Sequence, residues 1–214
     1  MENFYYDSFI KMLKNLNENQ NVNVLKSEIQ YILDPFQVNE VSEFINFKLD
    51  LTIIEFYTSI QKIQCYWMLK ENSEKIVYLD KEKDIVGGEV NILTQKEITC
   101  GVNGKKGKEL LDPFKIMDKI CIDDLERFLP FDYCTSEFAV CFRHELNLIK
   151  DNLFLIDFNV GPAPIDLNIN VKEYFEIGIK NMFFFGWQRA VFLADGKIAE
   201  KMYSYLKQLK NIDN

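Results

Sequence analysis

Cys141 and His144 are the residues whose types best suit chemistry, because a thiol beside an imidazole can act as a nucleophile with its base. His144 is the single histidine among 214 residues. General-base catalysis and zinc binding rely most often on histidine, so the sequence offers few residues for either. Residues 138–142 read as a strand, and side chains three positions apart point to opposite faces of a strand. We therefore expect the two side chains to lie apart, with His144 at the surface or at a strand end.

A segment rich in glycine and lysine, residues 101–109, has the composition of a phosphate-binding loop. Five residues rather than four separate Gly101 from Gly107, and Glu109 stands where a Ser or Thr must reach the metal ion. The chain contains no GxGxxG motif and no Gly-x-Ser-x-Gly nucleophile elbow. We expect a solvated loop here, and we expect no cofactor.

Three carboxylates, Asp80, Glu82 and Asp84, alternate with lysines in the manner of a calcium loop. Ile85 replaces the glycine that such a loop needs, and the bidentate glutamate is not at the required spacing. Alternating charges usually stay in water, so no metal site is expected. Together with Glu89, these carboxylates predict an acidic surface near the edge of a sheet.

The two tryptophans are candidates either for the core or for the apolar centre of an interface. Trp67 lies in residues 63–69, where apolar and polar side chains alternate as in a strand, and it is predicted to face the core. Trp187 follows three consecutive phenylalanines and Gly186, and both alternatives stay open for it.

Hydrophobic periodicity predicts the elements that position these residues. The expected helices are 9–16, 25–33, 39–49, 51–60, 171–182 and 198–209. The expected strands are 63–69 and 76–79, paired as a hairpin, together with 138–142 and 153–158. Helix 51–60 is too densely apolar for a surface helix, and the two prolines of residues 161–164 are expected to end the sheet. These elements predict one α+β domain over 1–214, with N-terminal helices, a central mostly antiparallel or mixed sheet, and C-terminal helices packed on it.

Composition limits the kinds of partner. With 25 basic and 33 acidic residues, the net charge of −8 repels phosphate backbones and anionic lipid, so neither nucleic acid nor a membrane is expected. A basic protein partner fits this charge, although such charge also serves solubility. Five scattered cysteines without a CxxC pair, and an N-terminus unlike a secretion signal, predict a reduced protein of the cytoplasm.

The order of several short segments resembles the SUKH superfamily, which contains fungal Smi/Knr regulators of cell-wall synthesis and bacterial immunity proteins. The similar segments are 40–44, 47–57 with Ile60 and Trp67, 128–132 with the strand 138–142, and residues 174, 175, 187 and 188. The chain departs from the family pattern at Leu49-Asp50, where Leu-Pro is common, and at Gln61-Lys62, where Asn-Gly is common. Residues 1–35 have no counterpart and are expected to form a helical N-terminal extension.

The resemblance implies a protein that binds a partner and is not an enzyme. In the bacterial branch the partner is a toxin, often a nuclease with a basic groove, which matches the acidic charge of this chain. A regulatory binding module is the alternative, and a small enzyme of unrecognised class is a third. The residues expected to bind the partner are Asp80, Glu82, Asp84, Glu89 and Trp187.

Overall fold

The computed structural model describes residues 3–31, 48–70, 86–100, 111, 125–133, 138–146, 148–157 and 160–210. Several predictions fall outside these residues and stay predictions. They are the helix 39–49, the strand 76–79 and its hairpin, the loop 101–109, and the carboxylates Asp80, Glu82 and Asp84.

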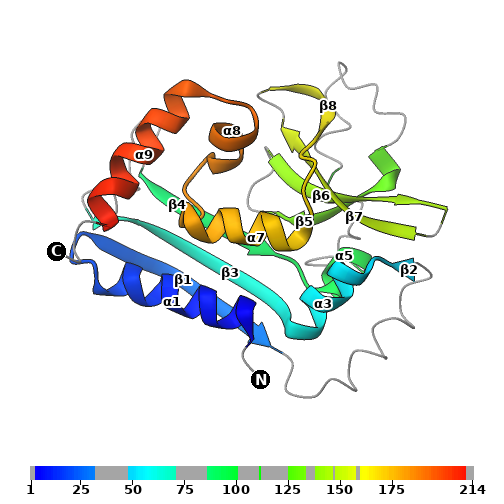
Figure 1. Cartoon of the computed structure of the whole chain (residues 1–214), viewed down its shortest axis with the longest axis horizontal. Coiled ribbons are helices and arrows are strands. Elements are labelled where there is room, and N and C mark those ends of the chain that lie inside the picture. The colour runs from blue at the N-terminus through cyan, green and yellow to red at the C-terminus, as the bar shows by residue number, and fades with distance from the viewer. Residues whose placement is uncertain are drawn as a thin grey trace. The chain divides into compact units, whose positions relative to one another are not determined.

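Within the described residues, eight strands belong to one hydrogen-bonded sheet in the order β1-β3-β4-β5-β6-β7-β2, with β8 also paired to β7 (Figure 1). Pairing is antiparallel from β4 through β8, whereas β2 runs parallel to β7. The strands are β1 (Val22–Tyr31), β2 (Lys48–Leu49), β3 (Ile60–Leu69), β4 (Gly87–Ile92), β5 (Phe128–Asp132), β6 (Phe138–Glu145), β7 (Leu148–Asp157) and β8 (Gly161–Asp166).

The helices of the described residues complete an α+β protein. They are α1 (Phe4–Glu18), α3 (Leu51–Ser59), α5 (Gln95–Cys100), the 3-10 helix η4 (Leu125–Arg127), α7 (Val171–Lys180), α8 (Trp187–Phe192) and α9 (Gly196–Lys210). The predicted α+β class with a mixed sheet is confirmed. Periodicity also located α1, α3, α7, α9, β3, β6 and β7.

The chain forms two compact units, each assembled from segments that lie apart in the sequence. Unit 1 contains Met1–Glu28, Gln64–Val90 and Phe175–Asn214, and unit 2 contains Ile29–Ile63 and Asn91–Tyr174. Each is described by itself below.

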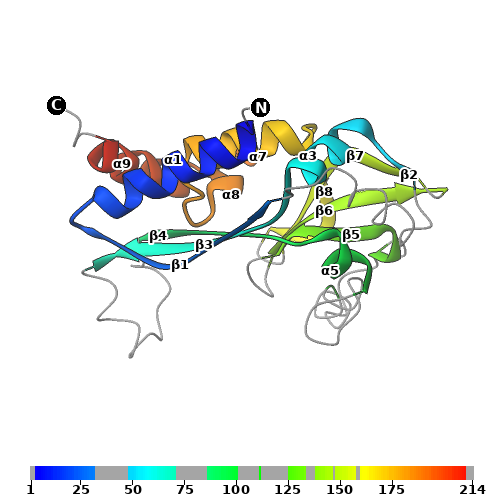
Figure 2. The same cartoon turned by 90° about the horizontal axis from the view of Figure 1, so that it is seen from below.

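Unit 1 is built around aromatic side chains. Helices α1, α8 and α9 lie on the same side of strands β1, β3 and β4 (Figure 2). Trp67 on β3 is fully buried, as predicted, and its ring lies 6.3 Å from that of Phe184, which stacks on Tyr205 of α9. Helix α1 begins after Asn3, whose side chain accepts a hydrogen bond from the Tyr6 amide and so satisfies a free donor of the first turn.

A strained turn after α7 holds the Trp67 indole. Met182 and Phe183 both have positive φ angles, 52° and 48°, which cost bulky side chains energy. The Met182 carbonyl accepts a 2.8 Å hydrogen bond from Trp67 Nε1, and the Phe183 carbonyl accepts one from the Glu89 amide. Gly88 lies against the indole so closely that a Cβ there would collide with it. The tertiary contacts of the tryptophan therefore stabilise this turn.

Unit 2 centres on a buried carboxylate. Asp132, at a bulge in β5, accepts hydrogen bonds from the Asn91 amide at 2.9 Å and from the Tyr174 hydroxyl at 2.6 Å. Asn91 Nδ2 donates in turn to the Tyr133 carbonyl. Phe131 fills the space beside this network, with ring contacts to Phe56, Phe142 and Tyr174. A buried carboxylate is tolerated here because its oxygens are hydrogen-bonded.

An ion pair at the start of α5 also belongs to unit 2. Lys62 Nζ lies 2.6 Å from Glu97 Oε1, while Glu97 and Thr94 exchange the reciprocal hydrogen bonds of a capping box. Burial opposes the charge of Glu97, but hydrogen bonds from Lys62 and Thr94, together with the charge of Lys62, outweigh it and lower the pKa of this carboxyl.

The predicted helix 25–33 is wrong, and with it half of the helical N-terminal extension. Residues Val22–Tyr31 form strand β1 at one end of the strand order. Leu25 and Ile29 fit a helical spacing, but Val22, Val24 and Ile29 are β-branched and favour a strand. Short apolar segments of this kind fit both periods, and pairing in the sheet decides between them.

The expectation that residues 161–164 cannot continue the sheet is also wrong. Gly161–Asp166 form β8, with Leu155 opposite Ile165 and Asp157 opposite Gly161. Prolines are tolerated on edge strands, and β7 is the partner of β8 among the described strands.

Candidate functional site

The strand register separates the two residues best suited to chemistry. Cys141 pairs with Phe154, and His144 pairs with Ile149, so the two side chains leave β6 on opposite faces, as predicted. The Cys141 thiol is fully buried, and burial raises its pKa far above the ordinary value. A thiol in this setting is a small hydrophobic side chain rather than a nucleophile.

Cys65 on β3 is a second buried thiol. Burial, and to a smaller extent the charge of Glu89, raises the pKa of Cys65 to about 12. In the part of the chain that the structure describes, no three His, Cys, Asp or Glu side chains come together as a metal site would require.

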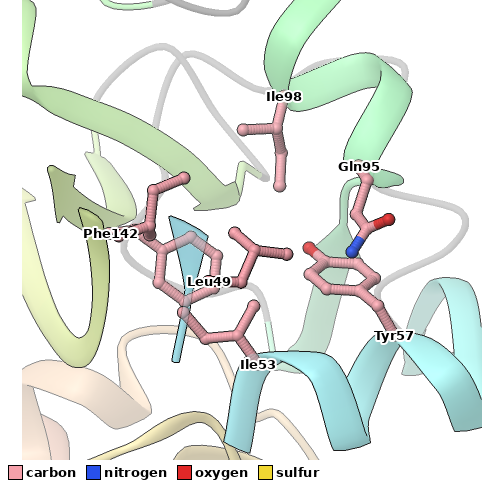
Figure 3. A pocket seen from close by; sticks show the side chains of 7 residues that line it. Leu49, Ile53, Tyr57, Gln95, Ile98 and Phe142 are labelled. Carbon is pink, nitrogen blue, oxygen red and sulfur yellow. The ribbon is translucent and has the colours of Figure 1, made fainter. Parts of the chain in front are cut away.

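A small pocket in unit 2 is lined mainly by apolar side chains from β2, α3, α5, β6 and β7, together with Gln95 of α5. In Figure 3, Leu49, Ile53 and Phe142 converge toward Tyr57 and Ile98. The Tyr57 hydroxyl donates to the Leu93 carbonyl at 2.9 Å, and burial raises its pKa, with a further contribution from the charge of Glu97. The cavity volume of about 10 Å³ is near the minimum for one water molecule, so the pocket is a packing gap.

Two of the five residues predicted to bind a partner are described, and both lie in unit 1. Glu89 is half-buried on β4. Burial is the larger cause of the raised pKa values of Cys65 and Tyr66, and the nearby charge of Glu89 raises both further. Trp187 is 1% exposed and packs between Phe183 and Phe192. The interface alternative for Trp187 is therefore corrected, because its side chain fills the core of its own unit.

Helix α3 presents an apolar surface that sequence reasoning missed. Leu51 is 73% exposed, and Ile54, one turn along the same face, is 36% exposed. Glu55 is exposed beside them, and Asp50 precedes the helix as its N-cap. We call these four residues the α3 face: Asp50, Leu51, Ile54 and Glu55.

The α3 face is held in place by bonds to β7. The Asp50 amide donates to the Ile149 carbonyl at 3.1 Å, and Thr52 Oγ1 donates to Asp151 Oδ2 at 2.8 Å. Ile53, Phe56 and Tyr57 point inward. The expectation that helix 51–60 is too densely apolar for a surface helix is therefore wrong for its outer face. Apolar side chains surround the helix, and the sequence does not tell which of them are covered.

The β6–β7 hairpin carries a second exposed surface in unit 2. Leu146 at its tip is 101% exposed and has a positive φ of 46°. Leu148 pairs with Glu145 of β6 and with Lys48 of β2, so these three side chains share one face of the sheet. Ile149 lies on the opposite face, in the pocket with Ile53.

Comparison with protein-family models, with curated protein sequences and with solved structures found no significant match. Among the described residues, no helix combines the length and the apolar character that crossing a bilayer requires.

Proposed function

We propose that this chain is a non-catalytic binding protein, and that its most fitting role is that of an immunity protein that neutralises a toxin by direct binding. The exposed Leu51 and Ile54 of the α3 face carry the proposal. Exposed apolar side chains on a fixed element, bordered by polar residues, are the usual form of a protein interaction site.

Charge supports a basic partner for this surface. Asp50 and Glu55 border the two apolar side chains, and the whole chain carries a net charge of −8. A nuclease toxin has a basic groove for its substrate, and opposite potentials accelerate association. The resemblance to the SUKH superfamily supports the same role. The carboxylates Asp80, Glu82 and Asp84 extend the acidic character of the sequence.

The environment of the reactive side chains also supports binding rather than catalysis. Both described thiols are buried with raised pKa values, and Cys141 does not share a strand face with His144. Changing Cys141 and His144 together to Ala should leave binding intact in a protein that remains folded.

The test is co-purification of the full chain with toxin domains encoded beside its gene, together with survival of cells that express both proteins. Leu51→Ser and Glu55→Lys should weaken binding and protection, and thermal unfolding should show that both variants fold. Tyr203→Ser and Glu176→Lys are matched controls, since both residues are exposed in unit 1.

The dependence of the association rate on salt measures the electrostatic contribution to this binding. The association rate should fall as salt rises, because the Debye length shortens to roughly 8 Å at physiological ionic strength. An association rate that does not change with salt, together with unchanged binding in all α3-face variants, would contradict the assigned surface. Failure of every neighbouring toxin to bind, with no protection of cells, would contradict the immunity role itself.

A further inference from the structure

The face of the β6–β7 hairpin differs in charge from the rest of this acidic chain. Among the side chains that the structure describes at this end of the hairpin, four are cationic, Lys48, Arg127, Arg143 and Lys150, and the carboxylate beside them is that of Glu145. Lys150 Nζ is 2.7 Å from Glu145 Oε2, and Arg143 Nε is 3.7 Å from Glu145 Oε1. Lys48 reaches the same face through its pairing with Leu148. Arg127 directly precedes Phe128, the residue opposite Arg143.

The electrostatics of Glu145 agree with this arrangement. The pKa of its carboxyl is lowered first by the hydrogen bond from Lys150 and the charge of Lys150, and then by the charges of Arg143 and Arg127. The other described carboxylate of this face, Asp166, lies farther along the strands opposite Phe154, where it accepts hydrogen bonds from Asn152 and the Asn168 amide. The hairpin end is therefore locally cationic.

Two leucines lie within this cationic surface. Leu148 sits between Lys48 and Glu145, and Leu146 projects from the turn. The Leu146 backbone lies in the left-handed region, which Gly and Asn tolerate far better than Leu. Full exposure and an unfavourable backbone both disfavour leucine at this position, so stability of the fold does not account for it. Backbone strain of this kind is common at functional sites.

We infer that the hairpin face, defined by Lys48, Arg127, Arg143, Leu146, Leu148 and Lys150, is a docking surface for an acidic segment of a partner protein in which carboxylates flank apolar side chains. Charge complementarity selects the occupant: the four cationic groups attract carboxylates, while the leucines require apolar contacts. Nucleic acid is disfavoured because a phosphate backbone makes no apolar contact with the two leucines. The inference goes beyond the proposed function, because this partner segment has the opposite charge to the basic groove expected at the α3 face.

The packing beneath the hairpin face supports its use as a docking surface. Glu145 is held by Lys150 and Arg143, and the guanidinium carbon of Arg143 lies 6.0 Å from the centre of the Phe154 ring. Phe154 packs against Phe128, which belongs to a buried cluster with Cys141 and Ile156. A surface fixed before binding loses less entropy on association than a mobile one.

The experiment measures binding of fluorescent decapeptides to the full chain. The probe alternates Glu and Leu, and the comparison probes are a Lys/Leu peptide, a Glu/Ser peptide and a single-stranded ten-nucleotide DNA. We expect the Glu/Leu peptide to bind best, with affinity that falls as salt rises. Lys150→Glu should weaken it about tenfold, whereas Lys207→Glu on α9 makes the same charge change at an exposed site in unit 1 and should have little effect.

Leu146→Asn separates binding from folding. Asn suits the left-handed backbone, so the thermal midpoint should stay the same or rise while peptide binding falls severalfold. Equal effects of Lys150→Glu and Lys207→Glu would overturn the inference, because they would show attraction by overall charge alone. It would also be overturned if the DNA or the Lys/Leu peptide bound more tightly than the Glu/Leu peptide, if no peptide bound, or if Leu146→Asn left binding unchanged.

Discussion

The interiors of the two units contain different kinds of polar side chain. The buried polar residues described in unit 1 are amides, whereas those in unit 2 are carboxylates. The amides are Asn19, Asn181 and Gln188, and the carboxylates are Asp132 and Asp157. Unit 1 positions Trp67 through an uncharged hydrogen bond to a backbone carbonyl, while unit 2 joins Asn91, Asp132 and Tyr174 through a carboxylate.

This difference determines what each unit should respond to. An uncharged aromatic interior depends on shape, so changes of volume should affect unit 1 most. An interior that contains carboxylates depends on hydrogen-bond partners, so removal of single polar atoms should affect unit 2. The following predictions test this contrast, beginning with the largest effect.

Trp67→Ala should have the largest effect. Removal of a fully buried indole leaves a cavity in unit 1 and should lower the free energy of unfolding by about 3–5 kcal/mol. Chemical denaturation measures the loss. Trp67→Phe removes the hydrogen bond to Met182 but keeps an aromatic ring, so it should cost clearly less. A folded Trp67→Ala protein of normal stability would contradict the view that shape dominates unit 1.

Tyr174→Phe should have the next largest effect, in unit 2. It removes one hydroxyl and leaves Asp132 without a 2.6 Å donor, at a cost of about 1–3 kcal/mol. Tyr203→Phe, which removes the hydroxyl of an exposed tyrosine in α9, is the control and should be nearly neutral. Equal denaturation midpoints for both variants would remove the contrast between the units.

Glu97→Gln should destabilise unit 2 by about 0.5–1 kcal/mol, since it removes a partly exposed ion pair with Lys62 and weakens the cap of α5. Because the folded pKa of Glu97 lies below the unfolded value of about 4.3, its contribution is present above that value. The contribution is lost as the pH falls through the folded pKa. Thermal unfolding between pH 7 and pH 3 should show a smaller acid loss for the variant than for the natural chain.

Leu146→Asn should change stability least, by about 0.5 kcal/mol or less and toward higher stability, because the leucine is fully exposed and its backbone favours Asn. Thermal unfolding measures this directly. A large loss would mean that the hairpin tip belongs to the packed structure of unit 2, and Leu146 would then no longer support a docking surface.

Sequence periodicity predicted the elements whose patterns were unambiguous and failed where two structures shared one pattern. The alternation of residues 63–69 allowed one interpretation, and β3 carries the buried Trp67 as expected. Residues 25–33 fitted both a helix and a strand, and only pairing in the sheet decided between them.

Exposure was harder to predict than secondary structure. Leu51 and Ile54 look like core residues in the sequence, and only the tertiary fold leaves their face uncovered. Trp187 could have served either role, and the packing of Phe183 and Phe192 around it decides for the core. The cationic hairpin face could not be predicted, because residues 48, 127, 143 and 150 come together only through strand register.

The prolines of β8 have a consequence for how the chain behaves at high concentration. The pairing of β8 with β7 is irregular between Gly161 and Ile165, the stretch that contains Pro162 and Pro164. Proline has no amide hydrogen, so neither position can donate to a further strand. An incoming strand would find no donor at these two positions. Strand β8 is thus protected against the edge-to-edge pairing that begins β-aggregation. Any self-assembly of the chain should therefore start from another edge of the sheet.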